Sequence, residues 1–436
     1  MTSPRTTPRS APRSAPRRRG SCPGVLAPMA VGDGFLVRVR VPAGVLPADK
    51  ARAIAELGGR YGSGLIDLSQ RANLQLRGVA ETDLPALTEG LRMLGYVSAD
   101  AASEGVRNVM ASPAAGLDGT EVLDVRPYVL ALDDRLAADR DLHRLPAKFG
   151  WLVCGGGRLP LAGSRTDVRF DAVATEFGPC FRVALGGTLT DAVPLGLCRP
   201  ADLVEVAAAL GRAFLALRAE LPEPPRRMAG LVAAVGAEKI AAALPMRLLP
   251  LPAGEGVAGP AAFPDPGAAD DRWLPAAFPF GRLTCATLAA LAELAEELRL
   301  TPWRGVLLVR PRAGAAEAAR RLGAILDPAD PRLKVTACSG ITGCDVGTTD
   351  THADGVAIAE RAGLLLAAAR MVHVSGCAKG CAHPGVADVT LTAREGVYDL
   401  ALAAAPGAPP RLAGLSPADA VAAVADLTIE EVLSGA

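Results

Sequence analysis

Aromatic side chains and long apolar runs are both scarce in this sequence. Only 4% of the 436 residues are aromatic, although 50% are hydrophobic, so Ala, Leu, Val and Gly dominate. No apolar run reaches the roughly 20 residues that a membrane-spanning helix needs. The formal net charge is zero, which argues against a general nucleic-acid or membrane-surface binder. We therefore expect a globular protein of two to four domains.

The sequence also lacks the signals of export and of nucleotide binding. Residues 1–20 are rich in Arg, Ser, Thr and Pro and contain no acidic residue and no apolar signal segment, so we predict a disordered tail. No GxGxxG sits in a βαβ unit, so we predict no nucleotide-binding fold, and any electrons that the protein uses would come from a separate reductase or ferredoxin even if NADH is their ultimate donor. The cysteine count is odd, at nine, which is not a secreted disulfide framework. We expect a reducing, cytoplasmic setting.

Four of the cysteines form two tight pairs, and the other five are scattered. Cys338 and Cys344 lie in CSGITGC, and Cys377 and Cys381 lie in SGCAKGC. The residues between the pairs, 353–374, read as a helix and then a short strand, so both pairs lie on glycine-rich loops. Four thiolates can hold zinc or an iron–sulfur cluster, and the wide first spacing favours a cluster. Zinc and ordinary thiols remain the alternatives. We interpret the scattered cysteines as tail or buried thiols: Cys22, Cys154, Cys180, Cys198 and Cys285.

A row of polar side chains alternates with leucines over residues 64–79. Arg71, Asn73, Gln75 and Arg77 occupy alternate positions of GLIDLSQRANLQLRGV, so they share one face of a predicted strand. Periodicity alone leaves two interpretations open, a solvated face or a row directed into an anion-binding cavity.

The cysteine motif resembles that of the sulfite and nitrite reductase superfamily. In that superfamily four such cysteines bind one 4Fe–4S cluster, and the last also bridges to siroheme iron. The segment VHVSGCAKGCAHPG is most similar to one branch, the precorrin-3B synthase family of aerobic cobalamin biosynthesis. The resemblance implies that Cys338, Cys344, Cys377 and Cys381 are the cluster ligands.

Three further segments are similar to superfamily active-site motifs. The resemblance of SQRANLQLRG, EGVRNVM and LPAKFG implies catalytic roles for Arg71, Arg107 and Lys148. The family has a second active-site lysine where this chain has Gly150. That departure counts against the reduction of sulfite or nitrite.

The chain also repeats itself. NVMASPAAGLD aligns without a gap on KVTACSGITGC, so Ser112 lies opposite Cys338 and Asp118 opposite Cys344. TPWRGVLLVR similarly echoes SQRANLQLRG, and we align Arg304 with Arg71. We therefore predict an α+β fold with pseudo-twofold duplication: two ferredoxin-like half-domains plus two α/β sulfite-reductase-like domains, one of which carries the cluster. The predicted divisions are the tail at 1–20, the half-domains at 21–95 and 223–315, the cluster-free α/β domain at 96–222 and the cluster domain at 316–436.

The function implied by the resemblance is a monooxygenation. The substrate would be precorrin-3A, a tetrapyrrole with many carboxylates, which is hydroxylated with closure of a γ-lactone. Arginine favours two-point carboxylate binding. The candidate substrate-binding residues are Arg71, Arg77, Arg107, Lys148, Arg304 and Lys379.

A cluster held by four cysteines has no open site for dioxygen, so the resemblance also implies one mononuclear non-haem iron, whose ligands the sequence does not identify. We interpret the four histidines as structural residues or as hydrogen-bond partners of metal ligands: His143, His352, His373 and His383. The alternatives are a siroheme-dependent sulfite or nitrite reductase and a non-catalytic zinc-stabilised protein. A monomer suffices, because the two copies would enclose one cavity within a single chain.

Overall fold

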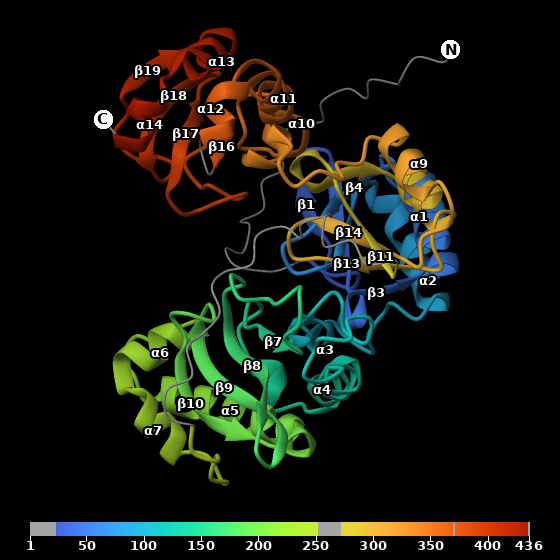
Figure 1. The fold of residues 1–436 in the computed structure, drawn as a ribbon, viewed down its shortest axis with the longest axis vertical. Helices are drawn as coiled ribbons and strands as arrows, with labels where there is room; N and C mark the ends of the chain where they lie inside the picture. Colours follow the sequence, from blue (N-terminus) through green and yellow to red (C-terminus); the bar gives the residue numbers. More distant parts are fainter. Residues whose placement is uncertain (1–22, 252–271, 369–370, 435–436) are drawn as a thin grey trace.

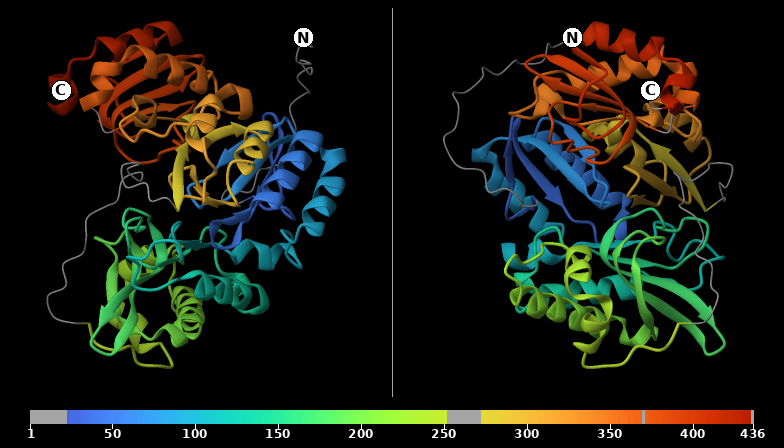
Figure 2. Two further views of the ribbon diagram at one scale, coloured as in Figure 1. Left: turned by 45° about the vertical axis from the view of Figure 1, so that its right-hand side comes forward. Right: turned by 90° about the vertical axis from the view of Figure 1, so that its left-hand side faces the viewer.

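The computed structural model describes residues 23–251, 272–368 and 371–434. The predicted tail at 1–20 and Cys22 lie outside the described residues. Figures 1 and 2 show an α/β unit at each end of the molecule, with two interlocked sheets between them. No helix of the described residues is long and apolar enough to cross a membrane.

The two central sheets exchange one strand each. One sheet has the order β1-β2-β5-β4-β12, and the other has the order β11-β14-β13-β3. The exchanged strands are β3, which pairs with β13, and β12, which pairs with β4. The bounds are β1 Met29–Val31, β2 Gly34–Val39, β3 Val45–Pro47, β4 Leu65–Leu68, β5 Leu74–Val79, β11 Trp273–Ala277, β12 Arg282–Thr284, β13 Glu297–Leu300 and β14 Gly305–Val309. The half-domains therefore share one hydrophobic core.

Helices cover this pair of sheets. In α1 (Ala48–Tyr61), the residues Ala51, Ile54, Ala55 and Gly58 recur at helical spacing and are buried. Helix α8 (Cys285–Ala292) begins at Thr284, whose hydroxyl accepts the Thr287 N–H at 3.0 Å. The sequence predicts a helix over 286–298, but the structure ends it at Ala292, because residues 297–300 join the sheet as β13. The others are α2 (Leu84–Met93) and α9 (Ala315–Arg321).

Backbone conformation confirms the duplication and corrects one register. Ala43 and Phe280 both have positive φ, at 54° and 59°, just before the exchanged strands. Ala72 and Arg304 form a second such pair, at 52° and 59°, in the turns that join β4 to β5 and β13 to β14. The Ala72 N–H donates to the Ser69 carbonyl oxygen, and the Arg304 N–H donates to the Thr301 carbonyl oxygen. Arg304 therefore corresponds to Ala72 and not to Arg71, so the predicted alignment was wrong by one residue.

The two end units have the same topology. Their sheets have the orders β10-β9-β8-β7-β6 and β15-β16-β17-β18-β19. In each, the first three strands along the chain are parallel and the last two antiparallel. The bounds are β6 Val109–Ala111, β7 Trp151–Cys154, β8 Thr166–Thr175, β9 Gly178–Gly187, β10 Val193–Cys198, β15 Val335–Ala337, β16 Val372–Ser375, β17 Ala387–Arg394, β18 Val397–Ala404 and β19 Leu412–Leu415.

Each end unit has a hydrophobic core between its sheet and its helices. The predicted helix over 353–370 is divided, because α11 ends at Arg361 and α12 begins at Gly363. The helices of the first unit are α3 (Ala101–Val106), α4 (Arg126–Ala138), α5 (Leu203–Ala219), α6 (Met228–Val235) and α7 (Ala237–Ala242). Those of the second are α10 (Gly340–Gly343), α11 (Thr351–Arg361), α12 (Gly363–Ala368), α13 (Pro417–Asp426) and α14 (Ile429–Ser434).

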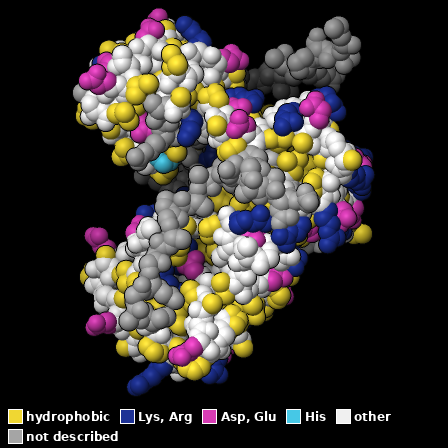
Figure 3. All heavy atoms as spheres, in the orientation of Figure 1, with side chains coloured by type: hydrophobic (Ala, Val, Ile, Leu, Met, Phe, Trp, Pro, Cys, Tyr) yellow, Lys and Arg dark blue, Asp and Glu magenta, His cyan; other side chains and the backbone are white. Residues whose placement is uncertain are grey.

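The surface is hollowed between the two end units, beside the central sheets (Figure 3). The architecture is the α+β fold with pseudo-twofold duplication that the sequence predicts.

Candidate cluster site and cationic pocket

The four paired cysteines meet at one edge of the second end unit. Cys338 directly follows β15, and Cys377 lies two residues after β16. These strands are parallel neighbours, so their carboxyl ends point to the same edge and bring the two loops together. Partial burial raises the pKa of the Cys381 thiol, and the nearby Cys338, Cys377 and Cys344 raise it further. The four sulfur atoms therefore share one electrostatic environment.

Glycines let the two loops approach closely. The Gly376 N–H donates to Cys338 Sγ at 3.2 Å, a contact that stabilises a thiolate. A Cβ atom at Gly376 would lie 3.3 Å from the Cα atoms of both Gly340 and Gly347. Gly340 has φ +55°, and a Cβ atom there would lie 2.5 Å from the Thr349 carbonyl oxygen. Gly340 therefore requires glycine, whereas a side chain at Gly376 would need its neighbours to shift by a few tenths of an ångström.

The donor set at this edge is the kind that holds an iron–sulfur cluster. Zinc draws four thiolates to about 2.3 Å from one point, whereas a cubane spreads them because each sulfur binds a different iron. Throughout the described residues, no three His, Cys, Asp or Glu side chains converge closely enough to hold one metal ion. The four thiols, the N–H···S bond and the glycine contacts are compatible with a 4Fe–4S cluster. The same finding identifies no ligand set for a mononuclear iron.

The first end unit has the same two loops without the thiols. Ser112 follows β6 as Cys338 follows β15, and Ser112 Oγ accepts the Gly155 N–H at 2.8 Å, the counterpart of the Gly376–Cys338 bond. This hydrogen bond confirms the predicted alignment of Ser112 with Cys338. Asp118 occupies the place of Cys344 and accepts the Arg158 N–H at 2.6 Å. Although burial raises the pKa of Asp118, that N–H and Thr120 hold it below its usual range.

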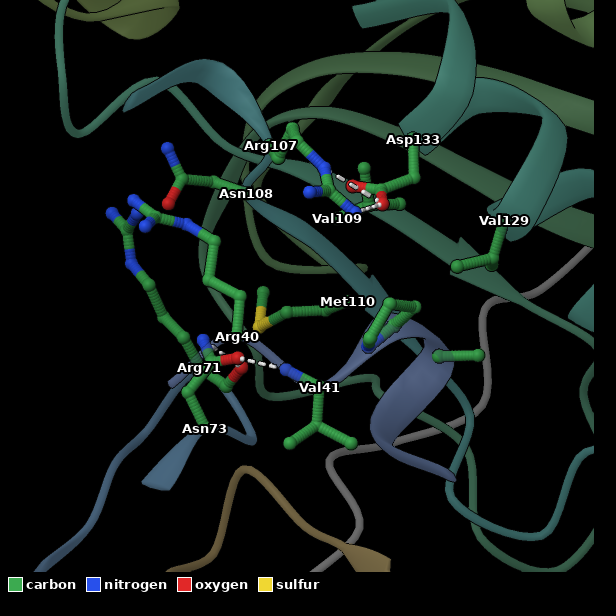
Figure 4. A pocket seen from close by; sticks show the side chains of 12 residues that line it. Arg40, Val41, Arg71, Asn73, Arg107, Asn108, Val109, Met110, Val129 and Asp133 are labelled. Atoms are coloured by element: carbon green, nitrogen blue, oxygen red, sulfur yellow. Dashed lines mark hydrogen bonds and ion pairs between the residues drawn. The ribbon is translucent and has the colours of Figure 1, made fainter. Parts of the chain in front are cut away.

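Arg71 and Arg107 lie around one small pocket between the β2–β5 sheet and the first end unit (Figure 4). Its volume is about 10 Å³, enough for about one water molecule. Arg71 Nη2 donates to the Lys148 carbonyl oxygen at 2.8 Å, while the Lys148 side chain is exposed. The Arg107 guanidinium donates to Asp133 and, at 2.8 Å, to Ser98 Oγ. The structure thus brings Arg71, Arg107 and Lys148 together.

Sequence reasoning missed Arg40 in this pocket. Arg40 is 7% exposed and lies 3.5 Å from Glu104. The sequence did contain a signal for it, because Arg38 and Arg40 alternate with valines in GFLVRVRV, the pattern of side chains that share one face of an extended segment. The polar row of 64–79 is therefore part of a wider cationic face.

Arg77, Arg304 and Lys379 lie away from that pocket. Arg77 is 3% exposed and contacts the loop between Cys338 and Cys344. Arg304 Nη2 donates at 3.2 Å to the carbonyl oxygen of Ala382, the residue after Cys381. Burial lowers the pKa of Arg304. Lys379 is exposed between Cys377 and Cys381. These three cations therefore surround the cysteine loops rather than the Arg71 pocket.

The histidines do not form one centre. His143 Nε2 lies 3.0 Å from the Ala137 carbonyl oxygen, and the His352 ring packs 4.6 Å from that of Phe280. His373 is fully buried on β16, with its ring 5.9 Å from that of His383. Neither ring nitrogen of His373 has a hydrogen-bond partner within the described part of the chain.

Comparisons with known proteins agree with this architecture. Residues 27–94 match the nitrite/sulfite reductase ferredoxin-like half domain, and residues 102–249 match the nitrite and sulphite reductase 4Fe-4S domain. The second match covers the first end unit, which lacks the four cysteines. The second end unit has the same topology and carries them.

Two relatives and one solved structure extend over most of the chain. A precorrin-3B synthase of Sinorhizobium sp is 30% identical over 399 residues, covering 88% of this chain and 82% of that protein. A ferredoxin–nitrite reductase of Synechococcus elongatus is 28% identical, covering 82% and 76%. The structure of Mycobacterium tuberculosis NirA matches with a TM-score of 0.69 at 22% identity, covering 86% and 76%, and supports the fold alone. The chain therefore belongs to the nitrite and sulfite reductase superfamily, in the family that includes precorrin-3B synthase.

Proposed function

We propose that this chain is an iron–sulfur oxidoreductase with precorrin-3B synthase activity. The reaction is a monooxygenation of precorrin-3A in which one atom of dioxygen enters the product and the other leaves as water. Two electrons and two protons come from an external donor, a reductase or ferredoxin supplied by NADH. The hydroxylated product closes a γ-lactone through one of its own acetate groups.

The observation that carries this proposal is the four-thiol site beside a cationic interior, in a chain with Gly150 at the second lysine position. Cys338, Cys344, Cys377 and Cys381 would hold a 4Fe–4S cluster, which when bound supplies single-electron transfer. Arg71, Arg107 and Lys148 would bind and orient the substrate carboxylates, with Arg304 and Lys379 on the cluster side. Arginine gives two-point hydrogen bonds to carboxylates, so these cations suit a polyanionic tetrapyrrole.

The proposal includes one mononuclear non-haem iron. The described residues offer no group of three ligands for it, so no step of the reaction is assigned to it.

The second candidate is a siroheme-dependent nitrite or sulfite reductase. It is favoured by relatives such as the ferredoxin–nitrite reductase of Zea mays, 28% identical over 407 residues, which covers 81% of this chain and 68% of that protein. Against it, Gly150 supplies no charge or proton where the family has lysine. Gly150 is buried, and its N–H donates to Asp167 Oδ2 at 2.9 Å. A purely structural zinc protein is disfavoured because it gives no reason for Arg71, Arg107 and Lys148 to match the active-site motifs of the family.

The test is a metal and sulfide count on protein purified without oxygen, followed by turnover with precorrin-3A and isotopically labelled dioxygen. We expect about four sulfides per chain, no siroheme bands, and a product that carries one labelled oxygen atom. Cys338→Ser should lose iron and sulfide. Cys154→Ser is the matched control, because Cys154 is a buried thiol at the position that Ser375 occupies in the second unit. Siroheme bands with nitrite reduction would select the second candidate, and zinc without sulfide would reject both enzymes.

A further inference from the structure

Arg77 is buried where the first central sheet meets the loop that joins Cys338 to Cys344. It projects from β5 and is 3% exposed. All five of its N–H groups donate within the protein. Nε and Nη2 bond the two carboxylate oxygens of Asp33 at 2.9 Å each, and Nη1 bonds Asp67 at 2.9 Å. The remaining donors reach Ser339 Oγ at 3.1 Å and the Gly343 carbonyl oxygen at 2.7 Å.

The last two partners are inside the cysteine loop, one at each end. Ser339 follows Cys338, and Gly343 precedes Cys344. One guanidinium therefore spans the loop from the first cysteine to the second. Its planar fork holds both ends at a fixed separation, which a flexible ammonium could not do.

A second arginine and two aspartates complete the network. Arg282 on β12 donates to Asp67 at 2.6 Å and, at 3.4 Å, to Ser339 Oγ. Although burial raises the pKa of Asp67, Arg282 and Arg77 together hold it below its usual value, so the carboxylate stays charged. Two cations and two anions leave the network neutral. Arg282 lies on the strand that one half-domain gives to the other, so the network exists only in the interlocked pair.

We propose that Arg77 is the positioning residue for the cluster: it holds the Cys338–Cys344 loop in its cluster-binding shape and fixes the charge around it. This inference rests on the proposed function, because it takes these cysteines as the ligands. A substrate carboxylate could bind Arg77 only by displacing one of its four partner residues, which together accept all five N–H groups. Arg77 therefore acts on the loop and not on the substrate.

The first end unit offers a matched control. Arg299, on β13, is 1% exposed, and its Nη1 donates at 3.2 Å to the Ala115 carbonyl oxygen. Ala115 lies in the loop from Ser112 to Asp118, which corresponds to the cysteine loop but has no thiols. Arg77→Gln and Arg299→Gln each remove a buried arginine from an equivalent kind of loop contact. Only the first should alter cluster properties.

A third variant perturbs the same contact from the opposite side. A Cβ atom at Gly343 would lie 2.3 Å from Arg77 Nη2, so Gly343→Ala must displace the guanidinium while leaving it charged. The network then keeps its net charge but loses its geometry. In Arg77→Gln the network loses both its neutral charge and its geometry, and one uncompensated carboxylate remains near the cluster.

The experiment measures iron and sulfide per chain, the electron spin resonance signal of the reduced protein and its midpoint potential. We expect Arg77→Gln to shift the potential to more negative values, because a lost cation disfavours the added electron, and to broaden the signal. Gly343→Ala should broaden the signal with a smaller shift in potential. Arg299→Gln should match the wild type in all three. If all three variants match the wild type, or if Arg299→Gln changes the cluster as much as Arg77→Gln does, the inference is wrong.

Metal-free protein gives a separate measure of loop order. Peptide-resolved alkylation should modify Cys338 and Cys344 several-fold faster in Arg77→Gln than in the wild type, with Cys377 and Cys381 unchanged. Equal rates would overturn the positioning role. A wild-type protein without iron and sulfide would instead reject the proposed function, and the alkylation rates would still decide whether Arg77 holds the loop.

Discussion

Acidification should destabilise this protein through His373, and replacement by leucine should remove that sensitivity. The imidazole is fully buried on β16, an interior strand of its sheet, and its ring nitrogens have no hydrogen-bond partner in the described ranges. Burial, together with the smaller effects of the nearby His383 and Arg304, lowers its pKa to about 4. The neutral ring is therefore the native form.

The sign and size of this pH effect follow from the linkage between proton binding and folding. The unfolded chain takes up the proton near pH 6.5, whereas the native protein takes it up only near pH 4. Between these values the unfolded state binds more protons, so the free energy of unfolding falls as pH falls. At 1.36 kcal/mol for each pH unit, the loss over this window is on the order of 3 kcal/mol. Above pH 6.5 this contribution is constant.

Leucine is the natural replacement, because Leu152 occupies the corresponding position in the first end unit. The assay is urea unfolding followed by circular dichroism at several pH values from 7.5 down to about 4.5, with wild type and His373→Leu measured side by side. The stability difference between the two should grow in favour of the variant as pH falls. Acid damage to a bound cluster would affect both proteins alike. If the free energy of unfolding falls equally with pH in both proteins, the acid sensitivity does not come from His373. His352 has a pKa of about 4 for the same reason of burial, so His352→Phe should remove a separate part of the sensitivity.

Three further outcomes are expected. Glu395→Asn should raise the free energy of unfolding by a few tenths to about 1 kcal/mol in urea, since Glu395 and Gly396 have φ of 53° and 87° in a two-residue turn that asparagine suits better; a loss would contradict that turn type. Leu298→Ala should cost about 2–5 kcal/mol by the same measurement, because the side chain is 0% exposed in the shared core; a smaller loss would mean that the core refills the cavity. Arg71→Gln should raise the KM for precorrin-3A roughly tenfold without changing iron content, since a charged hydrogen bond contributes about 1.5–3 kcal/mol; unchanged KM would remove Arg71 from the substrate site.

Much of the architecture follows from short-range patterns in the chain. The alignment of Ser112 with Cys338 needed no structure, and the matching N–H bonds of Gly155 and Gly376 confirm it. The polar row of 64–79 was also predictable from the sequence, because side chains alternate strictly along a strand. Where patterns were short, they failed. The helix predicted over 286–298 ran into β13 because so short a segment carries no reliable period, and the pairing of residues 297–300 with β3 and β14 decided their conformation.

The sequence by itself determined which residues carry the chemistry of a cluster: the spacing of the four cysteines, the glycines between them and the duplication are properties of neighbouring residues along the chain. Only the tertiary structure decided what the charged side chains do. Arg71 and Arg77 lie six residues apart, yet one lines a pocket with Arg40 and the other holds a loop more than 260 positions away. The reason is physical, because the role of a buried charge depends on the partners that replace its water, and those partners come from segments far apart in the chain, such as Asp67 and Gly343 at Arg77.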